Sequence, residues 1–425
     1  MMRLMNRGMS TVILVPLIIL LIAGAAFAGG GAESAETGDG VITLNVWATR
    51  DNYVLDLDDW YAENPNIRIN YEVVPWERQL DQLLLVAGTN RAPDVSSLDF
   101  PWVPVLGGLK HLLPLDDYID KIPASEINDF NPAVWDFVTF KGVKYAYPFT
   151  MFGRALYYRA DWFEDAGLSE PETWDDVIAA AKKLQDPAND IWGLSVRGKR
   201  DDGTTQGWLP IFHAMGGEIV DEIPQLDSPA GIRALELYRE LVWDHEIMSP
   251  DTVSFGSGEA RGMFISGQAV MSIIGSHIAP AVVRGGTDYP DFKLTHIPRL
   301  NRNDPKVNMP TSYQWAIMAN SQYPDEAMKF IRYLSRPEGQ KEFNISYMEA
   351  VRDSVYEMPE YKAAKPWSDF IQKDQAVSRP LPKLARYNQM SEIVQDALQE
   401  MLGNPNADAS AVAAAAQQKL NLIER

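Results

Sequence analysis

Runs of alternating apolar and polar residues, separated by segments of helical spacing, organise most of the chain. Residues 41–47 and 67–74 alternate as strands do, whereas residues 55–63 and 76–87 repeat apolar positions with the period of a helix. A third strand is predicted to open at Val95. Strands that alternate with helices at this spacing predict βαβ units and an α/β sheet.

The middle and the end of the chain continue in the same order of elements. Residues 143–147 and 155–158 are predicted strands. Thr173, with an acidic residue three positions later, is typical of a helix N-cap, and Ser228-Pro229 places a proline at the first position of another helix. Two helices separated at 403–405 are predicted to end the chain.

The N-terminal segment has the order of features found in a secretory signal peptide. Arg3 and Arg7 precede an apolar run at 11–23, and Ala26-Phe27-Ala28 supplies the small residues that signal peptidase recognises. A permanent membrane anchor is the alternative, but the apolar run is shorter than the roughly 20 residues that a spanning helix needs. We therefore expect residues 1–28 to be a signal peptide that is cleaved after Ala28.

The chain contains 0 cysteines, which removes disulfides, thiolate nucleophiles and cysteine-based zinc sites from consideration. It also leaves no cysteine for lipid attachment after the signal, so we expect a protein that is free in the periplasm and not a lipoprotein. Residues 29–40 are small and polar without apolar periodicity, and we expect them to form a flexible leader.

The net charge limits the kinds of partner that the protein can bind, and the length limits the number of its domains. The formal net charge of −20 repels phosphate backbones and anionic lipid headgroups, so neither nucleic acid nor a membrane surface is expected as a partner. With the signal removed, the 425-residue chain keeps enough residues for two domains.

The sequence carries no recognisable catalytic constellation. Its 5 histidines are not paired at helical spacing, and the GxGxxG, P-loop and GxSxG patterns are absent. Sequence alone leaves open paired carboxylates of the kind that a glycosidase needs, because the chain has 58 acidic residues. We expect a protein that is not an enzyme and that holds neither a cofactor nor a metal.

A series of short segments characterises the chain from residue 42 to its C-terminus. The most specific runs from Ala155 to Leu168, ALYYRADWFEDAGL, and is followed by PETWD at 171–175. The others are ITLNVW at 42–47, ENPN at 63–66, APDV at 92–95, LPLDDYI at 113–119, GGE at 216–218, LDSPAGIRALELY at 226–238, FISGQAVMSIIGS at 264–276 and the helical stretch 327–334 before RPE at 336–338. In this order, the segments resemble the family 1 extracellular solute-binding proteins of ABC importers, a group that includes maltose-binding protein.

The resemblance implies a two-lobed fold of the type II periplasmic-binding-protein class, in which each lobe is α/β and a multi-strand hinge joins them. The N-terminal lobe is expected over 41–149 plus 312–352, and the C-terminal lobe over 150–311 plus 353–425. The expected crossings between lobes are 147–154, 310–315 and 350–355. Ligand contacts from both lobes would favour a closed state that the transporter recognises.

The same resemblance places the ligand-binding residues at strand ends that face the cleft, as is usual in open α/β sheets. A sugar requires aromatic platforms for its ring faces and polar groups for its hydroxyls. The residues expected to contact the ligand are Trp47, Arg50, Asp51, Asp99, Trp102, Phe152, Arg154, Gln206, Trp208, Ser276, His277, Tyr313, Gln314, Trp315, Arg352, Arg386 and Tyr387.

Aromatic and basic residues enter this set for different reasons. Trp102 and Trp208 are predicted in loop or strand-end positions, where aromatic side chains favour binding. His277 occupies a turn that often carries a stacking aromatic residue in the family. An arginine alone is more often part of a surface ion pair, but two arginines of this set that converge would favour an acidic sugar.

We therefore expect the substrate-binding component of an ABC importer. It would bind a sugar or oligosaccharide between its lobes and deliver it, as a monomer, to the transmembrane subunits of the permease. Two alternatives stay open: an exported carbohydrate-active enzyme, and a ligand-sensing module for a receptor kinase.

Overall fold

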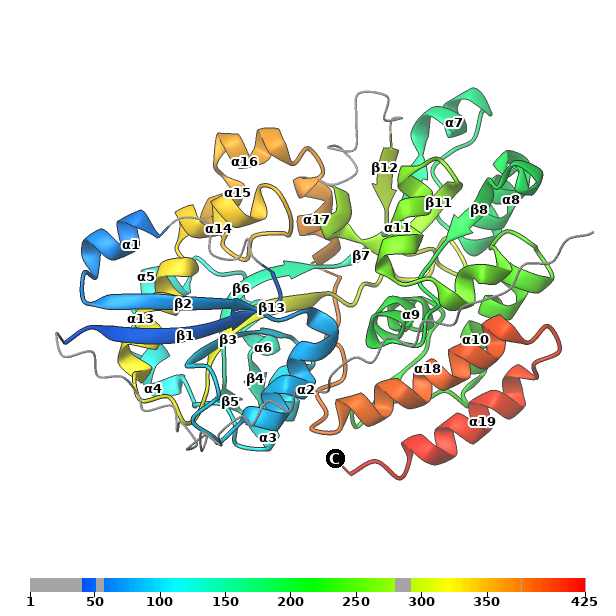
Figure 1. The fold of residues 1–425 in the computed structure, drawn as a ribbon. Coiled ribbons are helices and arrows are strands. Elements are labelled where there is room, and N and C mark those ends of the chain that lie inside the picture. The colour runs from blue at the N-terminus through cyan, green and yellow to red at the C-terminus, as the bar shows by residue number, and fades with distance from the viewer. Residues whose placement is uncertain (1–39, 51–56, 280–291, 376, 425) are drawn as a thin grey trace, which may run out of the picture.

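The chain folds into two α/β lobes that lie side by side (Figure 1). The structure, a computed structural model, describes residues 40–50, 57–279, 292–375 and 377–424. The predicted signal peptide and all but the last residue of the predicted leader lie outside the described residues. The expected α/β class and the two-lobed architecture are confirmed.

Five strands build the central sheet of the N-terminal lobe, in the order β2-β1-β3-β13-β6. Their bounds are β1 (Ile42–Ala48), β2 (Ile67–Val73), β3 (Val95–Asp99), β6 (Tyr147–Phe152) and β13 (Thr311–Ile317). β1 runs parallel to β2 and β3, whereas β13 is antiparallel to β3 and β6. β3, β6 and β13 are buried along their whole length, as expected for strands covered on both faces.

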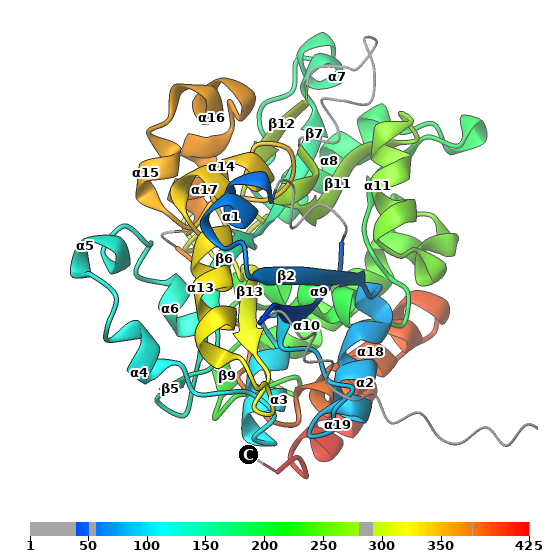
Figure 2. The same cartoon turned by 60° about the vertical axis from the view of Figure 1, so that its left-hand side comes forward.

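Helices surround this sheet and bury their apolar faces against it. They are α1 (Asp58–Glu63), α2 (Trp76–Val86), α3 (Trp102–Gly108), α4 (Asp116–Ile119), α5 (Ala124–Ile127), α6 (Val134–Phe137), α13 (Pro324–Leu334) and α14 (Pro337–Asn344), with a hairpin of β4 (Thr139–Phe140) and β5 (Val143–Lys144). α2 buries Leu80 and Leu83, and α13 buries Phe330 and Ile331. Figure 2 shows α2 and α13 on opposite sides of this lobe.

A four-stranded sheet of order β12-β7-β11-β8 forms the C-terminal lobe. Its strands are β7 (Arg154–Arg159), β8 (Trp192–Ser195), β11 (Ala269–Gly275) and β12 (Phe292–Thr295), and a separate pair is formed by β9 (Ile219–Val220) and β10 (Ile223–Pro224). β11 runs antiparallel to β7 and parallel to β8. All residues of β7 and β11 are buried.

Helices and short 3₁₀ segments complete the second half of the fold. They are α7 (Ala160–Asp165), α8 (Trp174–Leu184), η2 (Pro187–Asn189), α9 (Asp202–Ala214), α10 (Pro229–Trp243), η3 (Pro250–Ser254), α11 (Ser257–Ile265), η4 (Ser276–Ile278), α15 (Asp353–Tyr356), α16 (Pro359–Ala364), α17 (Ser368–Gln375), α18 (Tyr387–Gly403) and α19 (Ala409–Leu420). The predicted caps of α8 and α10 are confirmed, because Thr173 forms a capping box and the Ser228 hydroxyl accepts a bond from Gly231. Within the described ranges, no helix is both long and apolar enough to span a bilayer.

The first connection between the lobes lies at Gly153. β6 pairs with β13 as far as Phe152, and β7 begins at Arg154 in the other sheet. A boundary at residue 149 would therefore divide β6. The position of the lobe boundary depends on which strands pair, and the local pattern of apolar residues does not show pairing partners.

The last connection is made by helices. Arg352 pairs with Asp129 in the N-terminal lobe. Farther along the chain, Trp367 and Ile371 pack in a buried cluster with Tyr157 of β7. The segment from α15 to α17 therefore leads from one lobe to the other.

Candidate functional site

A cavity of about 560 Å³ lies between the lobes, within the usual size range of small-molecule sites. Side chains of the N-terminal lobe and of the C-terminal lobe both line it. Those used below are Arg50, Trp76, Asp99, Phe152, Tyr313, Arg154, Arg197, Lys199, Gln206, His277 and Tyr347. A molecule bound here would contact both lobes and hold them together.

Asp99, the last residue of β3, is a buried acceptor in the wall of this cavity. Its carboxylate accepts bonds from the Phe100 backbone N–H (2.8 Å), Thr311 Oγ1 (2.7 Å), Trp76 Nε1 (2.9 Å) and Gln206 Nε2 (3.3 Å). Burial raises the pKa of Asp99, although these hydrogen bonds oppose the shift. Asp99 thereby positions Trp76 and Gln206, which both line the cavity.

Gln206 of α9 connects the two lobes through its amide. Its Nε2 donates to Asp99 at 3.3 Å and to Asp202 at 2.8 Å, while its Oε1 accepts a bond from Arg154 Nη2 at 3.3 Å. The amide orientation is therefore fixed, with the nitrogen toward the carboxylates and the oxygen toward the guanidinium.

Arg154, the first residue of β7, is only 6% exposed. Its guanidinium lies 5.2 Å from the centre of the Phe152 ring. Burial, followed by the neighbouring charge of Arg197, lowers the pKa of Arg154 to about 10. Among the described residues, no carboxylate lies within ion-pair distance of Arg154, and its Nη1 is buried without a hydrogen-bond partner.

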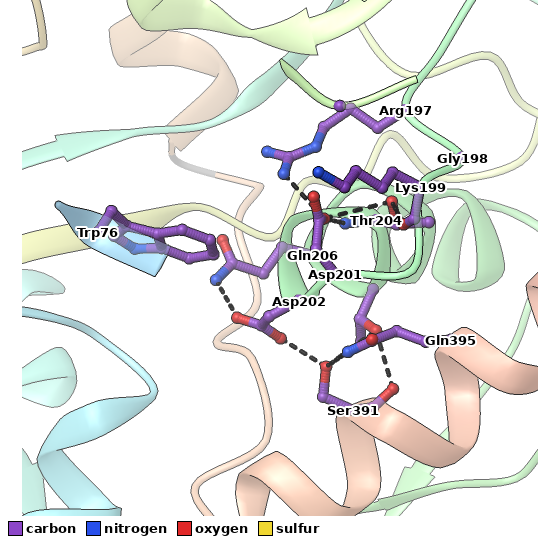
Figure 3. Close-up of polar contacts among 12 residues, drawn as sticks. Trp76, Arg197, Gly198, Lys199, Asp201, Asp202, Thr204, Gln206, Ser391 and Gln395 are labelled. Atoms are coloured by element: carbon purple, nitrogen blue, oxygen red, sulfur yellow. Dashed lines mark hydrogen bonds and ion pairs between the residues drawn. The ribbon is translucent and has the colours of Figure 1, made fainter. Parts of the chain in front are cut away.

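Arg197 and Lys199 extend side by side from the segment between β8 and α9, with their cationic ends toward the side where Trp76 lies (Figure 3). Arg197 Nη2 donates to Asp201 Oδ1 at 2.8 Å, and the same carboxylate caps α9 by accepting from Thr204 N at 3.1 Å. A Cβ at position 203 would lie 2.0 Å from Arg197 Cζ, so a glycine is required there for the guanidinium to rest on the first turn of α9.

Asp202 begins α9 and lies on a neighbouring hollow of about 240 Å³. Its Oδ1 accepts from Ser391 Oγ of α18 at 2.6 Å, and its Oδ2 accepts from Gln206 at 2.8 Å (Figure 3). Burial, reinforced by the charge of Asp99, raises the pKa of Asp202 to about 6.

His277 lies against two aromatic rings at the C-terminal-lobe wall. Its ring centre is 4.2 Å from that of Phe152 and 5.2 Å from that of Tyr347. Burial, followed by the charges of Arg154 and Arg50, holds the pKa of His277 well below its usual value. The side chain is therefore a neutral imidazole, whose buried Nδ1 has no partner among the described residues.

The structure brings seven of the predicted site residues to this cavity: Arg50, Asp99, Phe152, Arg154, Gln206, His277 and Tyr313. Two others lie beside it. Trp102 lines the neighbouring hollow, where its ring stacks on Trp76 at a centroid distance of 6.0 Å. Ser276 is 1% exposed and accepts a bond from Gly153 N at 3.2 Å, so it supports the lobe connection.

Trp208 does not line the cavity, which corrects the expected placement. It lies within α9 and not in a loop, it is 0% exposed, and its Nε1 donates to the Ala234 carbonyl at 3.3 Å. Its ring packs on Phe212 at 5.4 Å. The sequence Asp201–Gln206 contains turn-forming residues but folds as the capped start of a helix, which turns Trp208 into the core.

Arg352 and Arg386 also lie away from the cavity. Arg352 is 2% exposed and pairs with Asp129 at 3.1 Å in a separate hollow of about 670 Å³ on the N-terminal lobe. The side chain of Arg386 is half exposed and lies 3.6 Å from Glu424. Both form ion pairs with nearby carboxylates instead of converging on the cleft.

The remaining predicted residues pack in the protein interior or lie outside the described residues. Gln314, Trp315 and Tyr387 are fully buried, and Trp47 packs against the core from the end of β1. β13 is a central strand, so its side chains alternate between the two covered faces of the sheet. Asp51 lies outside the described residues.

Several lining residues were missed from the sequence. Trp76, Arg197, Lys199 and Tyr347 all line the cavity. The sequence analysis placed Trp76 only at the start of a helical stretch; Trp76 follows the end of β2, and Arg197 follows the end of β8. The expectation that residues after strand ends face the cleft, applied to these two strands, would have found both.

The described residues contain no group of three or more histidine or acidic side chains placed to hold a metal ion. The cavity presents aromatic faces, a fixed amide, a neutral imidazole, guanidinium groups and carboxylates. These groups suit a ligand with apolar ring surface and several polar substituents.

Comparison with known proteins identifies the class. Residues 48–341 match the family of bacterial extracellular solute-binding proteins. A protein of Brucella abortus that is named as a binding protein is 30% identical over 253 residues, which cover 57% of this chain and 59% of the relative. The chain therefore matches less than two thirds of that relative's length.

Solved structures agree with this match. T. maritima MalE3 bound to maltose has a TM-score of 0.80 at 22% identity and covers 90% of this chain and 100% of its own. An ABC transporter solute-binding protein from Agrobacterium radiobacter in complex with ribitol has a TM-score of 0.80 at 23% identity, covering 90% and 99%. At these identities the structures show a common fold. This chain belongs to the bacterial extracellular solute-binding proteins, as its segments indicated.

Proposed function

We propose that this protein is the ligand-binding component of an ABC importer and that it captures a sugar or sugar alcohol between its lobes. The observation that carries the proposal is the composition of the cavity, where the rings of Trp76, Phe152 and Tyr313 line the same space as Arg154 and Gln206. Sugars present apolar ring faces and hydroxyl edges, which match aromatic platforms and fixed hydrogen-bonding groups. The maltose and ribitol complexes of proteins with this fold support the choice.

In this proposal, export and delivery follow from the N-terminal segment and from lobe closure. The signal peptide is removed after Ala28, and the protein acts as a monomer in the periplasm without a lipid anchor, since the chain has 0 cysteines. Ligand binds the closed form better than the open form and shifts the population toward closure. The transmembrane subunits of the permease then recognise the closed form.

The proposal is tested by ligand-dependent stabilisation of the purified protein against a panel of mono- and oligosaccharides and sugar alcohols. A ligand that binds only the folded state raises the melting temperature with concentration. Replacement of the cavity residue Trp76 by alanine removes both a platform and the bond to Asp99, so we expect affinity to fall by about tenfold or more. Trp162→Ala is the matched control, because Trp162 is a half-buried tryptophan of α7 that does not line the cavity.

An exported carbohydrate-active enzyme is the alternative, and the same incubations distinguish it. Each sugar that stabilises the protein is recovered and analysed for cleavage or modification. Binding with unchanged sugar supports the importer component. Turnover, or the absence of any stabilising panel member, contradicts the proposal.

A further inference from the structure

A buried positive charge that has no counter-ion among the described residues, that of Arg154, faces the cavity. Arg154 is only 6% exposed, yet no carboxylate among the described residues lies within ion-pair distance of it. Buried charged groups in proteins are almost always paired, because desolvation of a lone charge costs several kcal/mol. The Nη1 atom of Arg154, which also has no hydrogen-bond partner among the described residues, is therefore an open donor in the wall of the cavity.

Three acceptors of the cavity wall, on Asp99, Asp201 and Gln206, are already used. The two carboxylate oxygens of Asp99 accept four hydrogen bonds, none of them from Arg154. Asp201 is engaged by Arg197 Nη2 and by the first turn of α9. Gln206 Oε1 takes the bond from Arg154 Nη2 and leaves Nη1 without an acceptor. Among the described residues, none of these three side chains offers Nη1 an acceptor, and a ligand bound in the cavity can supply one.

Neighbouring groups make this corner of the cavity attractive to an anion. Arg197 and Lys199 point into the same side of the cleft (Figure 3), and both line the cavity with Arg154. The proximity of Arg197 is strong enough to disfavour the charged state of Arg154. A negative charge placed between these cations would relieve their mutual repulsion and the desolvation of Arg154 together.

We propose that the ligand is a sugar acid, a carbohydrate or polyol that carries one carboxylate, and that this carboxylate binds Arg154. The inference rests on the proposed function and names its substrate class. A planar carboxylate fits a guanidinium by paired N–H···O bonds, and its single charge matches the one missing counter-charge. A phosphate monoester brings close to two negative charges near Glu77, Asp99 and Glu259, which also line the cavity.

The test compares matched acid and neutral ligands by calorimetric titration of the purified protein. The pairs are galacturonate with galactose and gluconate with sorbitol, and glucose 6-phosphate with glucose is a further pair. We expect the carboxylate member of at least one pair to bind about 100-fold more tightly than its neutral partner, since hydrogen bonds between two charged groups are about twice as strong as neutral ones.

Variants at Arg154 identify the group responsible. Arg154→Gln should reduce the preference for the acid to within about threefold, while Arg154→Lys keeps the charge and should retain part of the preference. Arg386→Gln is the control, because that arginine is half exposed and pairs with Glu424 away from the cavity. Thermal melts confirm that each variant is folded.

The outcomes separate this inference from the proposed function. A neutral sugar that binds more tightly than its acid overturns the sugar-acid inference and leaves sugar binding in place. A preference for glucose 6-phosphate, or an acid preference that survives in Arg154→Gln, overturns it as well. Absence of binding by every panel member, neutral and acidic, contradicts both.

Discussion

Protonation of the buried Asp202 carboxyl group should affect the free energy of unfolding. Its pKa is raised to about 6 from 3.8, chiefly by burial. Between these values, the unfolded chain has lost a proton that the native state keeps, so rising pH favours unfolding. The cost is complete above about pH 6 and amounts to about 3 kcal/mol.

Asp202→Asn replaces the ionisable group by one that stays neutral. We expect this variant to gain about 3 kcal/mol relative to the wild type between about pH 4 and about pH 7, as measured by denaturant unfolding at both values. Glu392→Gln is the control, because Glu392 is exposed on α18. An Asp202→Asn difference that does not change with pH would show that Asp202 titrates as an ordinary surface carboxyl.

The positions of individual side chains relative to the cavity were the hardest feature to predict from the sequence. Trp76 and Trp208 both lie in helices of the structure, yet the first lines the cavity and the second is wholly buried. The difference comes from the position of each residue within its helix: Trp76 opens α2 at the cleft edge, whereas Trp208 lies in the middle of α9 against α10. Asp99 was predicted because it stands at the end of the third strand, and Arg154 because the family resemblance places it at the first crossing between the lobes.

At the level of elements, the connection between β6 and β7 leaves no room for a side chain. A Cβ at Gly153 would lie 2.4 Å from Asn308 Nδ2. Asn308 is 1% exposed, and it bonds the backbone N–H and carbonyl of Arg154 at 3.2 and 3.0 Å. The amide cannot retreat without breaking these bonds.

Gly153→Ala should therefore destabilise the protein by about 1–3 kcal/mol, as overpacking usually does. Chemical denaturation measures the change. Gly262→Ala is the matched control, because a Cβ at that position of α11 meets nothing within 4 Å, and it should stabilise by about 0.5–1 kcal/mol through helix propensity. Equal effects of the two substitutions would show that the lobe connection tolerates a side chain.

Elements themselves were largely predictable, because they depend on short-range patterns. Alternation identified β1 and β2, helical spacing identified α2, α18 and α19, and caps together with helical spacing identified α8 and α10. Sheet order was not visible in these patterns. β13 lies between β3 and β6, although about 160 or more residues separate it from either strand, and the family resemblance supplied that arrangement. Because pairing was not visible, the expected lobe boundary after residue 149 fell inside β6.

For the whole molecule, the buried charges between the lobes determine the state of the ligand-free protein. Closure takes Arg154 and Asp99 out of water, and the Gln206–Asp99 bond of 3.3 Å is the direct polar link between the lobes at these groups. Desolvation of an unpaired guanidinium costs more than one such bond returns. The ligand-free protein should therefore favour an open arrangement, and the ligand should favour closure by supplying the missing acceptor.

Small-angle X-ray scattering checks this balance through the radius of gyration. The wild type should contract when the ligand identified in the titrations is added. Arg154→Met keeps a side chain of similar length but removes the charge, so closure no longer requires desolvation of a guanidinium. The ligand-free variant should have a smaller radius of gyration than the ligand-free wild type and should contract less in the presence of the ligand. Identical radii of gyration for the ligand-free variant and the ligand-free wild type would mean that Arg154 does not hold the lobes open. Other groups would then determine the free-energy difference between the open and the closed form.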